Sequence, residues 1–358
     1  MSSDIQKSIK TTEKLANDSI YDTNWCDMPS EIKAKCIGKM EFKERLSLRS
    51  TAKAERSLVD SQKIKFQKGV LMGELDNGDF EVSLDSENGN TVSFKTMKDR
   101  LELMKYIWKV GVFEELNVSI SPLFGEEEAP AMKEKFIGNT SEISAKNVGF
   151  GHCDTDIILY ILRNTKNGVE SIEMNAFGNP HPFDDILAIP QVQNTKYWHI
   201  EYHNQTDALH KVAQVWIDNN SSIGSTFQLS IDTNVSFDDF KGHFTERIIT
   251  TSTKRARIST NNPDHHILLE RGWNPYGVYF RPQFFRLTVI SADMKESDYD
   301  DNCKEWIRKL DPYFFNNWEN NVDDDPVPVD DQEDFWEHLP VDDSDDSDDS
   351  DDDQMLNL

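Results

Sequence analysis

The sequence predicts an α/β protein with a small helical N-terminal region, a long strand–helix region and an acidic C-terminal tail. Three observations support this division. Residues 22–65 carry apolar side chains at helical spacing, and residues 66–320 alternate short strand patterns with amphipathic helices. Residues 321–358 contain 17 Asp and Glu but no Lys or Arg. A segment of that composition buries too little apolar surface to offset its ordering entropy, so we expect this tail, like residues 1–21, to be disordered.

The composition of the chain argues against several classes of protein. With 358 residues, 37% of them hydrophobic, the chain can bury one large core or two modest ones. No apolar run approaches the roughly 18 residues of a membrane helix, and the first residues lack the apolar stretch of a secretory signal. Four scattered cysteines without Cys-x-x-Cys spacing fit a reducing compartment, so we expect a cytoplasmic or nuclear protein. Without the tail the net charge of −27 falls to about −10, and no basic, aromatic-rich face predicts nucleic-acid binding.

The helical N-terminal region is predicted to contain two helices, at residues 31–40 and 43–61. Pro29 suits the first turn of the first helix, where its missing N–H costs nothing. Apolar side chains recur along this helix at helical spacing and predict one stripe, formed by Ile32, Cys36, Ile37 and Met40. Between residues 31 and 65 there are ten Lys and Arg against five Asp and Glu, so the polar positions form a basic rim.

The long region opens with a predicted β-hairpin. The turn sequences Asn77-Gly78 and Asn88-Gly89 flank an alternating strand pattern at residues 80–84. A helix is expected at residues 96–110. One motif then recurs at a spacing of roughly 24 to 31 residues, namely a short alternating strand, a loop and an amphipathic helix.

We expect these units to stack side by side and bury their apolar faces in a continuous core. The predicted strands are 116–120, 148–150, 169–174, 198–202, 227–231, 256–258 and 285–289. The predicted helices are 155–163, 183–188, 207–219, 237–249 and 265–271, with 300–310 as a cap. A compact α/β body without a true repeat is the alternative.

Residues 24–65 resemble an F-box. The matching residues are Met28-Pro29, Glu31-Ile32, Cys36-Ile37, Met40, Arg45-Leu46, Leu48-Arg49 and Leu58. The whole chain also resembles the large nematode class of F-box proteins with an FTH-type or related F-box-associated domain, through residues 25–29, 54–63, 168–173 and 216–218. The resemblance implies a Skp-type adaptor and, through it, the cullin of an SCF-type ubiquitin ligase. It also implies a non-catalytic, leucine-rich-repeat-like domain at residues 66–320 that binds an unknown protein substrate.

The apolar side chains of the F-box-like region are the candidate adaptor-binding residues. About 42 residues make a poor core on their own, so part of this apolar surface must meet another surface. A few apolar anchors can then carry most of the binding energy, and a basic rim would speed encounter with an acidic adaptor. The predicted adaptor face comprises Met28, Pro29, Ile32, Cys36, Ile37, Met40, Leu46, Leu48 and Leu58. An ordinary helical subdomain packed against the α/β body is the alternative.

Two histidine-containing sequences resemble functional sites. His199-x-Glu201-x-His203 places three potential zinc ligands on one face of a strand, but ligands so close along a strand rarely converge on one ion. We expect instead a solvated face that belongs to the target-binding surface, together with Gln228 and Ser230. Asp264-His265-His266 is interpreted as a helix start. We therefore expect no catalytic residue, no metal and no cofactor.

The acidic tail suggests regulation and a second possible function. Repeated Asp-Asp-Ser sequences make Ser344, Ser347 and Ser350 candidate phosphorylation sites, modified stepwise from the C-terminal end. The alternative function is that of an acidic-tailed scaffold or chaperone for basic proteins.

Overall fold

The computed structural model describes residues 24–299 with gaps at 75–78, 96–99, 122–132, 135, 139–141, 167, 177–182, 202–206, 232–237, 253 and 274–282. The predicted disordered ends and the predicted helix at 300–310 lie outside the described residues. Within them, helices near the N-terminus lead into a strand-rich α/β region, as the sequence predicts. No helix among the described residues is long and apolar enough to cross a membrane.

The N-terminal helices are short and closely packed. They are η1 (Trp25–Asp27), α2 (Ser30–Lys39), α3 (Phe42–Thr51), η2 (Lys53–Glu55) and α4 (Arg56–Ser61). The prediction of one helix over residues 43–61 is wrong, because the chain leaves the helical conformation at Ala52, with φ −111° and ψ 85°. The turn lets Val59 of α4 enter the same buried cluster as Ile37 of α2 and Phe42 of α3.

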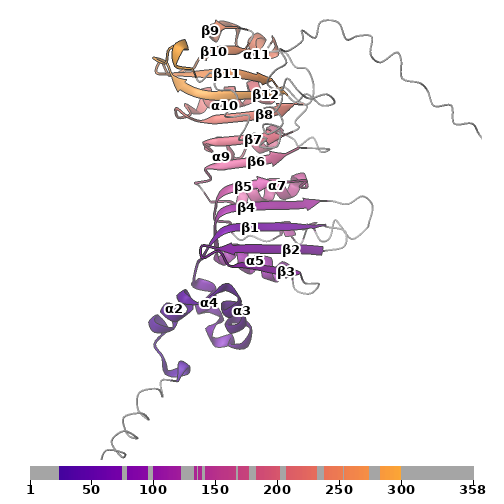
Figure 1. Cartoon of the computed structure of the whole chain (residues 1–358), viewed down its shortest axis with the longest axis vertical. Helices are drawn as coiled ribbons and strands as arrows, with labels where there is room; N and C mark the ends of the chain where they lie inside the picture. The colour runs from indigo at the N-terminus through magenta and orange to yellow at the C-terminus, as the bar shows by residue number, and fades with distance from the viewer. Residues whose placement is uncertain are drawn as a thin grey trace, which may run out of the picture. The chain divides into compact units, whose positions relative to one another are not determined.

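The described strands form one sheet of 12 strands in the order β3-β2-β1-β4-β5-β6-β7-β8-β12-β11-β10-β9 (Figure 1). Six neighbouring strands are parallel: β1 (Ile64–Glu74), β4 (Gly111–Ser121), β5 (Ala145–Phe150), β6 (Ser171–Asn175), β7 (Tyr197–Glu201) and β8 (Thr226–Ile231). Antiparallel strands flank them: β2 (Asp79–Ser86), β3 (Thr91–Lys95), β9 (Ile248–Thr251), β10 (Arg255–Ser259), β11 (His265–Trp273) and β12 (Gln283–Ser291).

Helices connect the parallel strands, and β4 to β8 follow one another in chain order. The remaining helices are α5 (Arg100–Val110), α7 (Thr155–Asn164), α8 (Phe183–Leu187), α9 (Pro190–Gln193), α10 (Asp207–Asn219), α11 (Asp238–His243), η3 (Thr245–Arg247) and η4 (Glu296–Asp298). Consecutive strand–helix units that stack side by side produce this order. Whether the units form a true leucine-rich-repeat-like array stays a prediction.

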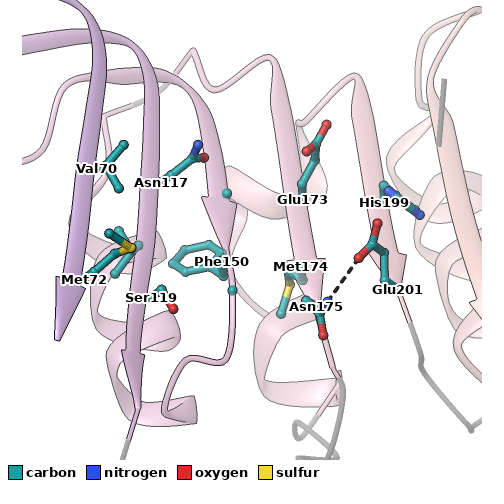
Figure 2. A pocket seen from close by; sticks show the side chains of 13 residues that line it. Val70, Met72, Asn117, Ser119, Phe150, Glu173, Met174, Asn175, His199 and Glu201 are labelled. Carbon is teal, nitrogen blue, oxygen red and sulfur yellow. Dashed lines mark hydrogen bonds between the residues drawn. The ribbon is translucent and has the colours of Figure 1, made fainter. Parts of the chain in front are cut away.

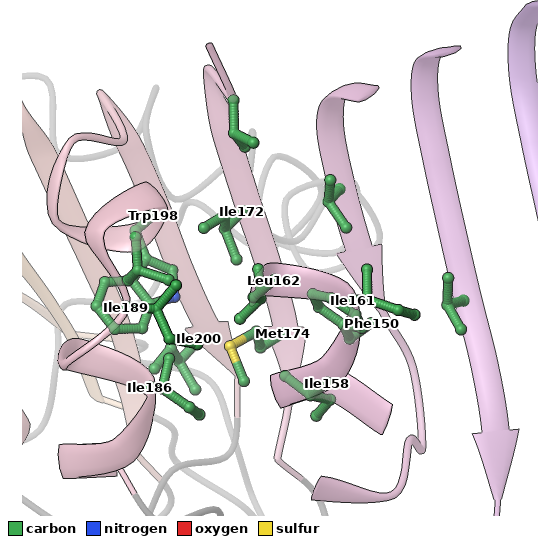
Figure 3. Close-up of a cluster of buried hydrophobic side chains, with 14 of the residues drawn as sticks. Phe150, Ile158, Ile161, Leu162, Ile172, Met174, Ile186, Ile189, Trp198 and Ile200 are labelled. Carbon is green, nitrogen blue, oxygen red and sulfur yellow. The ribbon is translucent and has the colours of Figure 1, made fainter. Parts of the chain in front are cut away.

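The hydrophobic core lies between the helices and one face of the sheet. Strand pairing aligns apolar residues in rows across β4 to β8, and one such row is Leu116, Val148, Ile172, Trp198 and Phe227. Helix α7 covers these rows with Ile158, Ile161 and Leu162, all buried (Figure 3). The alternation of apolar residues along each short strand therefore gives the sheet one apolar face.

One predicted helix is wrong, and a second is shorter than predicted. Residues 265–271, taken as a helix after Asp264, form β11, which pairs with β10 and β12. Ile267 and Leu269 point to one face of the sheet and Leu268 to the other, so the continuous apolar run fits a strand buried on both faces. In the described part of the predicted helix 237–249, the chain forms the short α11 and η3 before strand β9 begins at Ile248. Strand β1 has no counterpart in the prediction, because a bulge between Phe66 and Lys68 interrupts its alternation.

The N-terminal helices share a core with the first strands of the sheet. The Phe42 ring of α3 lies 5.6 Å from Phe66 of β1, 5.6 Å from Phe94 of β3 and 6.0 Å from Tyr106 of α5. The Arg49 guanidinium stacks over Tyr106 at 4.6 Å. The helical region is thus one packing unit with the beginning of the sheet.

Candidate functional site

One candidate surface is the solvent-facing side of helix α2. Ile32 is 42% exposed, which is unusual for a large apolar side chain in this structure. Pro29, which directly precedes α2, is exposed, and Met28 and Cys36 are half-buried. Lys35 and Lys39 are exposed on the same side of the helix. This α2 face, formed by Met28, Pro29, Ile32 and Cys36 with its lysine rim, has the apolar centre and polar edge of a protein-binding surface.

The structure places Ile37 on the opposite side of α2. Its side chain is 0% exposed and belongs to the internal cluster with Phe42 and Val59. Ile37 follows Ile32 by five residues, which corresponds to about 140° around a helix of 3.6 residues per turn. The single stripe expected from the sequence therefore divides into an outward and an inward half, and Ile37 contributes to the core of the protein.

The remaining candidate adaptor residues are half-buried against the same core, namely Met40, Leu46, Leu48 and Leu58. Arg45, 4% exposed, holds this arrangement together. Its guanidinium donates hydrogen bonds to the carbonyl oxygens of Met40 at 3.0 Å and Gly38 at 3.1 Å. Another donor lies 3.4 Å from the carbonyl oxygen of Lys63, at the entry to β1. Arg45 thereby joins the end of α2 to the start of the sheet, and burial lowers its pKa.

The second candidate surface is the face of the sheet opposite helix α7. A row of mostly polar residues crosses it, formed by Val70, Asn117, Gly149, Glu173, His199, Gln228, Arg286, Glu270 and Arg255. At its first half lies a depression of about 340 Å³ (Figure 2). Its floor is β5, where Gly149 has no side chain and a Cβ atom would collide with the Asn117 amide. We call this hollow, walled by β1 and β4 on one side and β6 and β7 on the other, the sheet depression.

Three predicted target-binding residues lie deeper in this face than expected. His199, Gln228 and Ser230 are only 4%, 5% and 7% exposed, so the expected solvated face is wrong at these positions. Tyr197 Oη donates a hydrogen bond to Gln228 Oε1 at 2.6 Å, which ties Gln228 to the neighbouring strand. Glu201 is half-buried, and its Oε2 accepts a hydrogen bond from Asn175 Nδ2 at 3.1 Å. His203 lies outside the described residues, as do Ser344, Ser347 and Ser350.

The electrostatics of the sheet depression are set by a neutral histidine and by carboxylates. Burial lowers the pKa of His199 to about 4, so the ring is uncharged at neutral pH. Its Nε2 has no hydrogen-bond partner in the described part of the chain. Desolvation, and then the nearby charge of Glu115, raise the pKa of Glu173, although that side chain reaches solvent. Sequence reasoning missed Glu173, yet the pattern Ser-Ile-Glu-Met-Asn of β6 alternates and could have placed it on this face.

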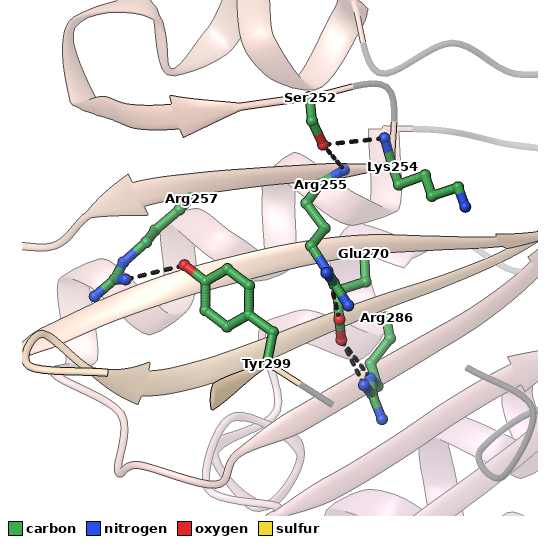
Figure 4. Close-up of polar contacts among 7 residues, drawn as sticks. All are labelled: Ser252, Lys254, Arg255, Arg257, Glu270, Arg286 and Tyr299. Atoms are coloured by element: carbon green, nitrogen blue, oxygen red, sulfur yellow. Dashed lines mark hydrogen bonds and ion pairs between the residues drawn. The ribbon is translucent and has the colours of Figure 1, made fainter. Parts of the chain in front are cut away.

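Farther along the same row, Glu270 joins three strands through ion pairs (Figure 4). Glu270 is 2% exposed. Its carboxylate accepts hydrogen bonds from Arg255 Nε at 3.1 Å and Arg286 Nε at 2.9 Å. The buried Arg257 donates to Tyr299 Oη at 2.9 Å and to the Ala292 carbonyl oxygen at 2.7 Å. Each buried charge is paired or hydrogen-bonded, which indicates a structural role.

The described residues hold no group of three or more His, Cys, Asp or Glu placed to bind a metal ion. His199 and Glu201 share a strand but make no such group with a third residue there.

Comparison with protein families identifies one part of the chain. Residues 25–67 match the family model of the F-box domain, so the chain contains an F-box that spans η1 to the start of β1. F-box domains bind Skp1-type adaptors, and their presence supports an adaptor role in substrate recognition.

The other comparisons add little to this assignment. No curated protein matches the chain. An rRNA methylase from Streptococcus thermophilus is 9% identical with a TM-score of 0.18, and the match covers 63% of this chain and 89% of that chain. An S-adenosylmethionine-dependent methyltransferase from Clostridium acetobutylicum is 11% identical with a TM-score of 0.12, and the match covers 80% and 84%. Both TM-scores are too low to carry any argument about this chain.

Proposed function

We propose that this protein is the substrate-recognition subunit of an SCF-type cullin–RING ubiquitin ligase. The F-box match at residues 25–67 is the observation that supports the proposal most strongly. The exposed α2 face offers an apolar centre for a Skp-type adaptor, and the adaptor connects the chain to a cullin. The lysine rim of α2 suits an acidic partner surface and would chiefly raise the association rate.

In this proposal the protein catalyses no reaction itself. It brings a target protein close to a charged ubiquitin-conjugating enzyme, and proximity makes the transfer effectively intramolecular. The shared core around Phe42 supports this role, because it joins the F-box helices to the sheet that would carry the target. We further propose that the sheet region is an FTH-type, leucine-rich-repeat-like domain and that the protein works in the cytoplasm or nucleus.

The α2 face can be tested with a matched pair of substitutions. We expect Ile32→Asp to weaken binding of a purified Skp-type adaptor to the full-length protein at least about tenfold, because one apolar anchor contributes about 1.4 kcal/mol or more. Ile223→Asp is the control, since Ile223 is also exposed, at 54%, but lies between α10 and β8. Isothermal titration calorimetry measures both affinities. Equal affinities for the two variants would contradict the proposed adaptor face.

The acidic tail favours a second candidate function, that of a scaffold or chaperone for basic proteins. The tail holds 17 Asp and Glu over residues 321–358 and could bind basic partners electrostatically. Deletion of residues 321–358 tests this function with a basic protein such as a histone as the probe. Histone binding lost with the tail, combined with no adaptor binding by the wild type, would favour the scaffold over the ligase subunit.

A further inference from the structure

We propose that the sheet depression binds an arginine or lysine side chain of the target protein. The proposal rests on the proposed function and deepens it, since it names the chemistry that a target segment would present.

The shape of the sheet depression suits a long side chain with an apolar stem. Gly149 of β5 and Gly151 just after it add no side chains to the floor. Val70 and Met72 of β1 line one wall (Figure 2). Met72 is 47% exposed, although strands β2 and β4 pair with β1 on both sides of it. Neighbouring strands are about 4.8 Å apart, so the walls on β1 and β6 are about 14 Å from each other. The volume of about 340 Å³ is large enough for an extended arginine or lysine side chain.

The charges around the sheet depression favour a cation. Glu173 and Glu201 stand on the wall opposite Met72, and Glu115 lies on the neighbouring row. Lys68 on this part of the face pairs with Glu115, with Nζ 2.8 Å from Oε1, so these two charges offset each other and the carboxylates of Glu173 and Glu201 remain. No hydrogen bond or ion pair within the described part of the chain engages the Glu173 carboxylate. Desolvation, and then the nearby negative charge of Glu115, raise the pKa of Glu173.

His199 supplies an observation that is independent of the carboxylates. Its ring lines the sheet depression, is 4% exposed and leaves Nε2 without a hydrogen-bond partner in the described residues. A buried polar atom without a partner is destabilising, so a native structure seldom keeps one without a use. Because Nε2 is buried, the His199 ring must turn toward the sheet depression before a guanidinium or ammonium N–H can donate to it. The hydrogen bond would then satisfy this atom, with the positive charge near Glu173.

Methyl NMR of the full-length protein with labelled methionines tests the proposal. The probe is N-acetyl-arginine amide, and N-acetyl-citrulline amide is the neutral control of the same shape. We expect the arginine probe to shift the Met72 methyl signal and to leave the signal of Met40, in the F-box, in place. The citrulline probe should shift neither. A residue-specific signal separates binding in the sheet depression from binding to the acidic tail.

Two variants make the result specific. Glu173→Gln should weaken the arginine probe about fivefold, the effect of losing one partly exposed charge pair. Glu170→Gln is the matched control, because Glu170 lies just before β6 and pairs with Lys146 at 3.6 Å, outside the hollow. An unchanged Met72 signal, equal shifts with citrulline, or equal affinities for the two variants would each overturn the proposal. Adaptor binding by Glu173→Gln is a separate readout. If this variant still binds the adaptor, a negative NMR result counts against the cation site alone. If the wild type does not bind the adaptor, the result counts against the proposed function.

Discussion

Replacing Phe42 with alanine should destabilise the sheet as well as the F-box helices. Phe42 lies on α3, but it is 4% exposed and contacts rings from β1, β3 and α5. Truncation of this side chain therefore opens a cavity at the junction of the helices and the first strands. Since the buried cluster is continuous from Ile37 to the last strands, the substitution should lower the free energy of unfolding of the F-box helices and the sheet together.

The structure allows the size of this loss to be estimated. A buried Phe→Ala change costs about 3–5 kcal/mol in general. Two of the three ring partners of Phe42 are in edge-to-face geometry, an arrangement that contributes about 0.5–1.5 kcal/mol per pair beyond the buried area and places Phe42 in the upper part of the range for buried Phe→Ala changes. We expect a loss of about 4–5 kcal/mol in the free energy of unfolding, a large part of the 5–15 kcal/mol that typically holds a domain together.

Urea unfolding followed by tryptophan fluorescence measures this loss at a distance from the substitution. Trp108, Trp198 and Trp216 are buried in the strand–helix region and report on its unfolding. Phe240→Ala is the control, because Phe240 of α11 is equally buried but has one described ring partner. That partner is Phe244, just after α11, at 5.0 Å. A Phe42→Ala protein whose fluorescence midpoint matches the wild type, with only the helical signal lost early, would refute a shared core.

Three further predictions follow from the polar face of the sheet. Glu270→Ala should cost about 3–5 kcal/mol of unfolding free energy in urea, because it leaves two arginines without their buried carboxylate; a loss below about 1 kcal/mol would contradict the structural role of the network. His199 should make stability depend on pH, because its folded pKa of about 4 lies below the unfolded value of about 6.5. Its contribution to the free energy of unfolding is complete above pH 6.5 and is lost as the pH falls towards 4. Between pH 7 and pH 4.5 the wild type should lose about 2–3 kcal/mol more than His199→Gln, and parallel pH profiles would exclude this assignment. Gly149→Ala should destabilise the fold by about 1–3 kcal/mol and displace the Asn117 amide, seen as a shift of its side-chain NMR signal; an unchanged signal would show that the floor of the sheet depression tolerates a methyl group.

Local sequence pattern predicted the elements that carry a clear period. The helix at residues 207–219 has the bounds of α10, because its apolar residues recur on one face and bury Leu209, Val212 and Trp216. The short strands β4 to β8 were predicted from their alternation for the same reason. Residues 265–271 show the opposite case: a continuous apolar run fits a helix or a buried strand equally well, and only pairing with β10 and β12 decides between them.

The candidate sites were less predictable, because sequence spacing does not determine depth. Ile32 and Ile37 are both apolar residues of one helix, yet one is exposed and the other lies in the core that Val59 and Phe42 complete. His199 and Gln228 lie on the predicted face of the sheet, but neighbouring strands on both sides bury them. The sequence predicted no role for Glu270 and Arg257, since their partners are brought together only by strand pairing and by the chain after β12.

Hydrogen–deuterium exchange of the full-length protein, with and without a purified Skp-type adaptor, tests the account most directly. If the α2 face binds the adaptor, amides of residues 30–39 should exchange more slowly in the complex, whereas those of β6 and β7 should keep their free rates. Protection confined to the sheet, or none at α2 under conditions where the adaptor is bound, would contradict the central claim.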